Sequence, residues 1–144
     1  MRVADILDRK GGAVHSVLAW RPVSVAIERL DEEGIGALVV CAEGQALRGI
    51  ITERDIVRGL RRHGPGLLDM RIEDVMTRHV VTCGPDERIT AAMARMTHGR
   101  HRHLPVVEDG RLVGMVSIGD IVEHRLREVE LETGVLRDAF IAHH

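Results

Sequence analysis

Apolar residues along the chain alternate between helical spacing and short continuous runs. Spacing of the type i, i+3, i+4, i+7 begins at Val23 and again at Ile89 and predicts an amphipathic helix at each place. Short runs rich in β-branched and aliphatic residues lie on either side of these helices and predict strands. The predicted strands are 14–18, 37–41 and 47–52 in the first half of the chain, and 80–83, 104–107 and 112–117 in the second half.

Turn signals join these elements into two units of the same order. A glycine-bearing turn at 43–44 and at 109–110 connects the last two strands of each half and predicts a hairpin. Another helix is expected to begin near Asp55 and near Asp120, so each half has the order β-α-β-β-α. The polar segment 61–66 is rich in glycine and proline and predicts the connection between the halves.

The helical pattern that begins near Asp120 continues through Glu132. Beyond Gly134 we expect a separate short helix over 135–141, amphipathic enough to pack on a partner subunit. These patterns divide one module into a first repeat (1–62), a linker (63–70), a second repeat (71–128) and a C-terminal helical tail (129–144).

The two halves also resemble each other residue by residue. Displacing the sequence by about 66 positions aligns 49–52 with 114–117 and 55–57 with 120–122. A single unit of about 60 residues would bury little apolar surface by itself, so we expect the two units to pack face to face. The predicted fold class is therefore α/β (α+β), with two β-α-β-β-α repeats packed sheet to sheet.

Composition narrows the classes of function. The 144 residues are 44% apolar, which suffices for a core without disulfides or a metal. The 20 basic and 22 acidic residues are scattered and leave a net charge of −2, which argues against nucleic acid or a membrane as a partner. The longest apolar stretch, 35–42, is too short to cross a bilayer, and no signal-peptide pattern is present, so we expect a cytoplasmic protein.

Residues with reactive side chains are sparse. Cys41 and Cys83 lie in apolar runs and are expected to be buried free thiols, with redox sensing as the alternative. His98, His101 and His103 are interspersed with arginine, which suits a phosphate-facing loop, so we predict no metal site and keep zinc as the alternative. No nucleophile-base pair, Walker loop or zinc-protease motif is present, and we predict a non-enzyme without catalytic residues.

The motifs G-I-I-T-E-R-D-I-V (49–57) and G-M-V-S-I-G-D-I-V (114–122), with R-H-L-P-V-V (102–107) before the second, resemble cystathionine β-synthase (CBS) domains. The resemblance covers nearly the whole chain, and the motif occurs twice at the spacing of a tandem pair. It implies a pseudo-twofold module with two clefts that bind AMP, ADP, ATP, NAD or S-adenosylmethionine. It also implies a non-catalytic regulatory role, a homodimer, and an unidentified regulated protein as partner.

The resemblance assigns residues to both clefts, because each cleft takes its ribose carboxylate from one repeat and its base-contacting strand from the other. The first nucleotide site would combine Thr52, Arg54, Asp55, Val81, Thr82, Arg102 and His103. The second nucleotide site would combine His15, Ser16, Gly36, Ala37, Ser117 and Asp120. An aspartate at the end of the last strand would accept hydrogen bonds from both ribose hydroxyls, each contributing roughly 1.5 to 3 kcal/mol.

We expect the Asp55 cleft to bind a phosphorylated ligand more tightly than the Asp120 cleft. Arg54, Arg102 and His103 would address phosphate there, whereas glycine and alanine occupy the corresponding positions of the other cleft. Equal losses of affinity on replacing the two aspartates would contradict this asymmetry.

Two alternatives stay open. A threonine or serine three residues before an aspartate also matches a helix capping box, in which both side chains bond the backbone at the start of a helix. In addition, a ligand-free interaction or stress-response protein would use the same scaffold and its C-terminal helix to recruit a macromolecule. Thermal stabilisation by AMP, ATP or NAD would distinguish a nucleotide sensor from this ligand-free protein.

Overall fold

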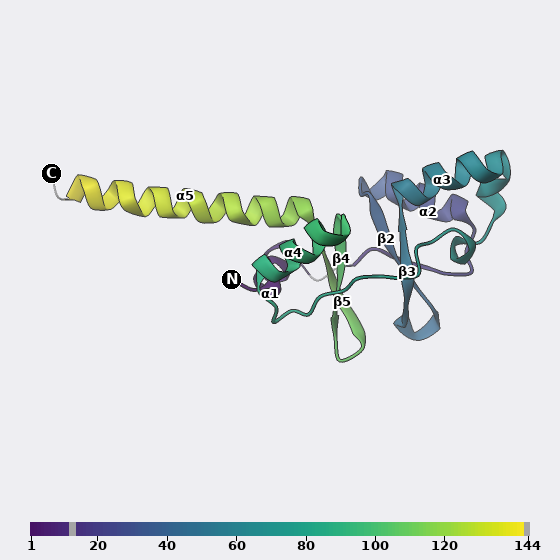
Figure 1. The fold of residues 1–144 in the computed structure, drawn as a ribbon, viewed down its shortest axis with the longest axis horizontal. Coiled ribbons are helices and arrows are strands. Elements are labelled where there is room, and N and C mark those ends of the chain that lie inside the picture. The colour runs from purple at the N-terminus through teal and green to yellow at the C-terminus, as the bar shows by residue number, and fades with distance from the viewer. Residues whose placement is uncertain (12–13, 143–144) are drawn as a thin grey trace.

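The computed structural model describes the fold of residues 1–11 and 14–142, and the side chains of these residues except 45 and 135–142. Figure 1 shows two halves side by side and one long helix that projects from the second half. The chain begins with α1 (Val3–Lys10), and the first half contains β1 (Ser16–Leu18), α2 (Val23–Glu33), β2 (Ala37–Cys41), β3 (Leu47–Thr52) and α3 (Glu53–His63). The second half contains α4 (Ile89–Gly99), β4 (His103–Glu108), β5 (Arg111–Ser117) and α5 (Ile118–Ala142). Short 3-10 helices are η1 (Glu43–Gln45), η2 (Gly64–Asp69) and η3 (Ile72–Asp74).

Each half is built on a hairpin, as the sequence predicts. In the first sheet β2 pairs with β3 in antiparallel register, with Ala37 opposite Thr52, and β1 adds a parallel strand beside β2. In the second sheet β4 pairs with β5, with His103 opposite Ser117. The mixed α/β class and the matching strand ends of the two halves are thereby confirmed.

The predicted strand at 80–83 is wrong, because only its last residue pairs with the sheet. The Cys83 amide donates to the Pro105 carbonyl oxygen at 3.0 Å, and the Val107 amide donates to the Cys83 carbonyl oxygen at 2.9 Å. A turn begins at Pro85, two residues later, so the contact with β4 cannot extend into a ladder. The second sheet therefore has two strands where the first has three.

Two hydrophobic cores hold the halves, and each is completed by a segment from outside its own β-α-β-β-α unit. The first core includes Leu67, Ile72 and Met76 beside residues of α2 and the first sheet. The second core includes Val3 and Ile6 of α1 beside residues of α4 and the second sheet. Helix α1 thus lies against β5 and α5, in the half that is more distant in sequence.

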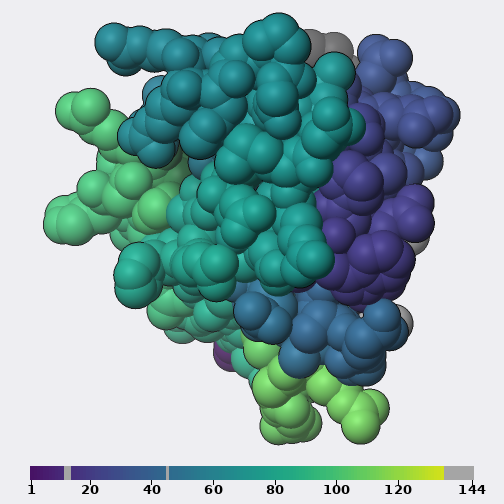
Figure 2. Space-filling view, turned by 90° about the vertical axis from the view of Figure 1, so that its right-hand side faces the viewer, coloured from purple at the N-terminus to yellow at the C-terminus, as the bar shows by residue number. Residues whose placement is uncertain are grey.

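The connection between the halves is folded against the first half. Helix α3 continues to His63, and η2 packs on α3 and α2 with Leu67 fully buried. Figure 2 shows the teal part of the chain spread over the middle of this end of the molecule. The predicted linker 63–70 therefore contributes to a core, while the predicted division of the chain into repeats stays a prediction.

Helix α5 is continuous where the sequence predicts an interruption. The predicted separate helix over 135–141 is wrong, because the backbone stays helical through Gly134 to Ala142. One glycine costs a helix about 1 kcal/mol relative to alanine, which a helix of 25 residues tolerates. Figure 1 shows the C-terminal part of α5 extending away from both sheets. The amphipathic face predicted for 135–141 lies outside the described side chains.

Candidate functional site

Asp55 lies near the start of α3, where the sequence predicts either a ribose ligand or a helix cap. The Asp55 amide donates to Thr52 Oγ1 at 3.2 Å, and the Thr52 amide donates to Asp55 Oδ2 at 3.0 Å, so the capping box is present. The Thr77 hydroxyl donates to Asp55 Oδ1 at 3.0 Å. Asp55 is only 7% exposed, and both of its carboxylate oxygens are engaged.

Asp120 takes part in the same capping arrangement but has a different third partner. The Ser117 amide donates to Asp120 Oδ2 at 2.9 Å, and the Asp120 amide donates to Ser117 Oγ at 3.1 Å. The Lys10 ammonium group lies 2.7 Å from Asp120 Oδ2 and donates to the Met115 carbonyl oxygen at 2.9 Å. The Asp120 side chain is 20% exposed, and its Oδ1 accepts no hydrogen bond from the residues that the structure describes. One carboxylate oxygen is therefore available to a ligand.

Burial and hydrogen bonding act on Asp120 in opposite directions. Burial would raise the pKa of this carboxyl, but hydrogen bonds from Lys10 and Ser117 outweigh it, and the pKa lies below its ordinary value of 3.8. Asp120 is consequently ionised at neutral pH. An ionised carboxylate only accepts hydrogen bonds, which suits it to a pair of ribose hydroxyls.

His103, at the start of β4, lies where the two halves meet. A Cβ atom at Gly36 would lie 3.8 Å from His103 Cε1 and 3.6 Å from Glu53 Oε1. Burial lowers the pKa of His103 below its ordinary value; Asp120 would raise it, and Lys10 opposes that effect. The structure therefore brings His103, from the first predicted site, beside Gly36 and within the electrostatic field of Asp120, both from the second.

A cavity of about 250 Å³ opens beside Asp120, between α1 and α5. It is lined by Ile6, Arg9, Lys10, Asp120, Glu123, His124 and Arg127. Three cationic side chains face two carboxylates, and Glu123 already pairs with Arg127 at 2.9 Å. His124 is 2% exposed; its Nε2 lies 3.3 Å from Glu128 Oε1, but neither ring nitrogen has a well-oriented hydrogen-bond partner among the described residues.

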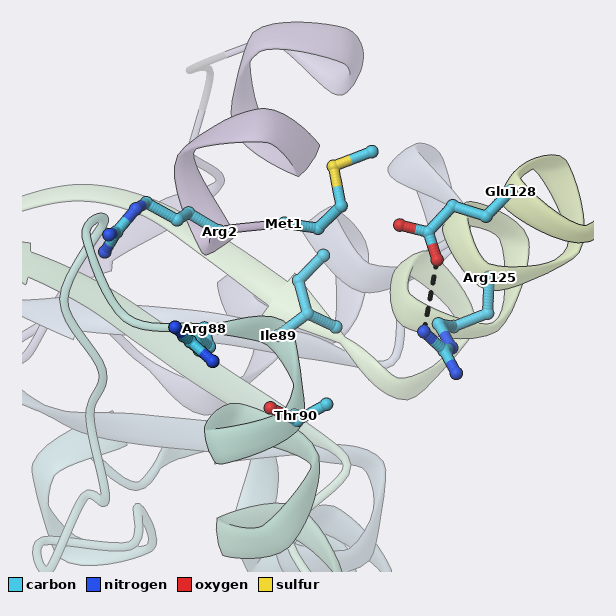
Figure 3. A pocket seen from close by; sticks show the side chains of 7 residues that line it. All are labelled: Met1, Arg2, Arg88, Ile89, Thr90, Arg125 and Glu128. Carbon is cyan, nitrogen blue, oxygen red and sulfur yellow. Dashed lines mark hydrogen bonds and ion pairs between the residues drawn. The ribbon is translucent and has the colours of Figure 1, made fainter. Parts of the chain in front are cut away.

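A larger cavity of about 440 Å³ lies farther along α5 (Figure 3). Its lining is Met1, Arg2, Arg88, Ile89, Thr90, Arg125 and Glu128. In Figure 3, Arg125 and Glu128 face Met1 and Ile89 across this space, and the dashed line marks their ion pair of 3.1 Å. This ion pair offsets the positive charge of Arg125. No residue of either predicted site lines this cavity.

The other predicted residues differ in exposure. Arg54, Val81 and Arg102 are exposed, His15, Ser16 and Thr82 are half-buried, and Ala37 is buried. Several of them already have partners inside the fold. His15 Nδ1 lies 3.8 Å from Glu33 Oε2, and the Ser16 carbonyl oxygen accepts a hydrogen bond from Arg29 at 3.2 Å. Their predicted contacts with a nucleotide stay predictions.

Two residues that complete the aspartate sites were missed by the sequence analysis. Lys10 and Thr77 contact Asp120 and Asp55 from segments that the helix and strand patterns do not connect to them. Residues 5–7 are similar to residues 74–76, and Lys10 and Thr77 follow these two segments. This similarity aligns Lys10 with position 79 and not with Thr77, so it does not identify the contacts.

The two cysteines are buried free thiols, as the sequence predicts. Burial raises the pKa of the Cys41 thiol. Burial, with a smaller effect of Glu87, raises the pKa of Cys83 to about 11, against the opposing effect of Arg95. Within residues 1–11 and 14–142, no group of three or more histidine, cysteine or acidic residues is arranged to hold a metal ion.

Comparison with known protein families gives a match to the CBS domain over residues 21–62 and 72–127. The chain is also similar to solved structures of CBS proteins. A CBS-domain containing protein from Agrobacterium tumefaciens is 40% identical, with a TM-score of 0.83, over 87% of this chain and 99% of that protein. The CBS domain pair of protein MJ0100, solved in complex with 5′-methylthioadenosine and S-adenosyl-L-methionine, is 29% identical, with a TM-score of 0.79, over 89% and 98%. These similarities confirm the predicted pair of repeats in a pseudo-twofold arrangement.

Similar curated proteins are longer than this chain. The mitochondrial CBS domain-containing protein CBSX3 of Arabidopsis thaliana is 37% identical over 136 residues, which cover 85% of this chain and 66% of that protein. An uncharacterized protein of Methanopyrus kandleri is 33% identical over 77% of this chain and 59% of its own length. The chain thus spans about three fifths to two thirds of these relatives. Among its described residues no helix is long and apolar enough to cross a membrane, and the cytoplasmic location stays a prediction.

Proposed function

The chain belongs to the family of CBS-domain proteins, and from this premise we propose that it is a non-catalytic regulatory module that binds an adenine nucleotide beside Asp120. The ligand is AMP, ADP, ATP or NAD. The observation that carries the proposal is the ionised, partly exposed carboxylate of Asp120 at the edge of a cavity with three cationic side chains. The adenosine compounds bound to the MJ0100 pair support a ligand of this class.

The sugar and the phosphate of such a nucleotide meet suitable groups near Asp120. The free Oδ1 accepts a hydrogen bond from one ribose hydroxyl, and a charge-assisted bond of this kind contributes roughly 1.5 to 3 kcal/mol. The phosphate lies toward Arg9 and Lys10 and near the N-terminus of α5, where backbone dipoles favour negative charge. The nucleotide is thereby held at the same end of α5 by both its sugar and its phosphate.

Asp55 has a structural role in this proposal. Its oxygens already accept hydrogen bonds from Thr52 and Thr77, so a ribose would have to break an internal hydrogen bond of a buried carboxylate. The expected preference for the Asp55 cleft depended on its neighbouring cations. Lys10 provides the Asp120 side with a cation from another part of the chain, so we assign the tighter site to Asp120.

In this proposal the nucleotide regulates the protein because it lies between the two halves. Gly36 and Glu53 of the first half lie beside His103 of the second half, close to Asp120. A nucleotide held by Asp120 and extending to Gly36 touches both halves. A ligand shifts a conformational equilibrium by its preference for one state, so a nucleotide that bridges the halves favours the arrangement in which they are close.

Thermal unfolding with added nucleotides tests this function. A nucleotide at 100 times its Kd should add about 2.7 kcal/mol to the free energy of unfolding. Asp120→Asn should abolish most of this gain, whereas Asp8→Asn, an exposed carboxylate of α1, should leave it unchanged. If AMP, ADP, ATP and NAD all fail to stabilise the protein, the ligand-free interaction protein becomes the better account.

The regulatory output requires a surface, and we propose that a second copy of the chain covers α3 and α5. Val57 and Leu60 of α3 are 65% and 48% exposed. On α5 a stripe at helical spacing is exposed: Ile118, Val122, Leu126 and Val129. Val57 and Val122 occupy corresponding positions of the two repeats, and Figure 1 shows both helices along the upper edge of the molecule. Exposed apolar stripes of this extent mark interaction surfaces.

Charge determines how two copies would pair. Arg58, Arg61 and Arg62 make α3 basic, and none of them has an ion pair among the described residues. Glu130 and Glu132 make the exposed part of α5 acidic and are likewise unpaired within the described chain. Contact between α3 and α3 of the partner would place like charges together, so we propose a head-to-tail homodimer in which α3 faces α5 of the partner.

Sedimentation of charge variants tests this pairing. Arg58→Glu with Arg61→Glu should weaken the dimer at least about tenfold, and adding Glu130→Arg with Glu132→Arg in the same chain should restore it. Val122→Glu should give a monomer because it places a charge in the apolar contact. A dimer that resists all of these changes uses another surface, and a wild-type monomer would leave α5 to a macromolecular partner.

A further inference from the structure

Lys10 already occupies the carboxylate that a ribose would use. Its Nζ lies 2.7 Å from Asp120 Oδ2, and the same oxygen accepts the Ser117 amide at 2.9 Å. The ammonium group is further held by the Met115 carbonyl oxygen at 2.9 Å. Any nucleoside that takes both oxygens of Asp120 must therefore move Lys10 or share the carboxylate with it.

A displaced Lys10 has no alternative anionic partner in its cavity. Glu123 is the other carboxylate in the lining, and it is bonded to Arg127 at 2.9 Å. Arg9 adds a further cation, without an ion pair inside the described chain. Separating a partly buried ion pair and leaving one member unpaired is unfavourable, so an uncharged nucleoside that takes both oxygens of Asp120 is penalised at this point.

A 5′-phosphate removes the penalty because it replaces the carboxylate as the partner of Lys10. The cavity of about 250 Å³ is large enough for a phosphate group and its water. His124 also lines this space, and its ring nitrogens lack a well-oriented partner among the described residues, so the ring can offer an N–H donor. The lining carries three positive side chains, Arg9, Lys10 and Arg127, and two negative ones, Asp120 and Glu123. This excess of positive charge favours an anion.

We propose that this site selects 5′-phosphorylated nucleotides over adenosine and S-adenosylmethionine, with Lys10 exchanging Asp120 for the phosphate of the ligand. This inference rests on the proposed function and specifies the ligand class of the same site. S-adenosylmethionine is disfavoured because its sulfonium would add positive charge beside Arg9 and Lys10. The site would thus differ in selectivity from the MJ0100 pair, which was solved with S-adenosylmethionine bound.

Calorimetric titration of the full chain with AMP, adenosine and S-adenosylmethionine tests this exchange. Wild-type protein should bind AMP at least about tenfold more tightly than either other compound, which corresponds to about 1.4 kcal/mol. In Lys10→Met the ratio of AMP to adenosine affinity should collapse toward one, because AMP loses its cation and adenosine no longer competes with Lys10. Arg48→Met, which removes an exposed cation of β3, should keep the wild-type ratio.

The outcomes separate this inference from the function on which it rests. If Lys10 only supported the fold, Lys10→Met would lower both affinities by the same factor, and that result would overturn the exchange. Equal binding of AMP and adenosine by the wild type, or tighter binding of S-adenosylmethionine, would also overturn it while leaving an adenosine site in place. Failure of all three compounds, together with ATP and NAD, would overturn the proposed function itself.

Discussion

Asp55 and Asp120 occupy corresponding positions of the two repeats, and they differ in what reaches them from outside. Each follows a capping hydroxyl by three residues and accepts a hydrogen bond from the backbone amide of that residue. Thr77 donates a hydrogen bond to the buried Asp55, whereas Lys10 pairs with Asp120 and leaves one carboxylate oxygen without a hydrogen bond among the described residues. The repeated sequence determines the local cap, and a distant segment determines which further partner each carboxylate has.

The difference arises because each half is completed by a segment from outside its own β-α-β-β-α unit. The segment after η3 stays on the first half, where Thr77 also pairs with Ile50 by two backbone hydrogen bonds of 3.0 and 2.9 Å. Helix α1 crosses to the second half and ends with Lys10 over the start of α5. The first repeat is therefore closed by a neutral backbone contact, and the second by a helix that ends in a cation. Only the second closure brings a cation, which the proposed exchange with an anionic ligand requires.

Replacing the two aspartates should give the largest difference between the repeats. Asp55→Ala leaves the Thr77 hydroxyl and the Thr52 amide without their buried acceptor, so we expect a loss of about 3 kcal/mol in the free energy of unfolding. Asp120→Ala removes a more exposed cap and one ion pair and should cost about 1 kcal/mol. Urea denaturation measures both, and equal losses would remove the proposed structural role of Asp55.

Gly49 and Gly114 leave room for the segments that complete the two halves. Replacing them with alanine should destabilise the first half more than the second, as with the aspartates, but by smaller amounts. A Cβ atom at Gly49 would lie 2.5 Å from the Thr77 carbonyl oxygen, and one at Gly114 would lie 2.6 Å from Leu7 Cδ2. Backbone cannot move as a side-chain end can, so Gly49→Ala should cost about 2 kcal/mol and Gly114→Ala about 1 kcal/mol or less. Thermal unfolding of the two variants checks this, and a larger loss for Gly114→Ala would reverse the comparison.

The smallest expected effect is a pH dependence on the Asp120 side. The folded protein holds the pKa of His103 below its ordinary value of 6.5, so the unfolded chain binds more protons as the pH falls below about 6.5. The contribution of His103 to stability is therefore complete above that pH and is lost as the pH falls toward the folded pKa. Urea denaturation of wild type and His103→Gln at pH 5 to 7.5 measures it, and a constant difference between them would contradict it.

The local spacing of apolar residues was sufficient to predict most of the helices and strands. The spacing from Val23 and from Ile89 predicted both amphipathic helices, and the strands 37–41 and 47–52 are found with the predicted bounds. The prediction failed at 80–83, where tertiary contacts determine whether a strand forms. The residue types there are typical of a strand, but only Cys83 pairs with β4. The prediction also failed at Gly134, because one glycine lowers the helix propensity by too little to end α5.

The aspartates of the candidate site could be located from the repeat, but their chemistry could not. The carboxylates and the capping hydroxyls lie three residues apart and form a local motif. Lys10 precedes Asp120 by 110 residues, and Thr77 follows Asp55 by 22, so neither contact has a periodic or motif signal. Counting cations near each motif in the sequence consequently favoured Asp55, whereas the folded chain places Lys10 on Asp120.

A crystal structure of the protein with AMP would test the different roles of the two carboxylates most directly. We predict that the ribose hydroxyls bond to Asp120, that Lys10 Nζ moves from this carboxylate to the 5′-phosphate, and that Thr77 still donates to Asp55. A ribose bound to Asp55 with the Thr77 hydrogen bond broken, and Lys10 still on Asp120, would contradict the account.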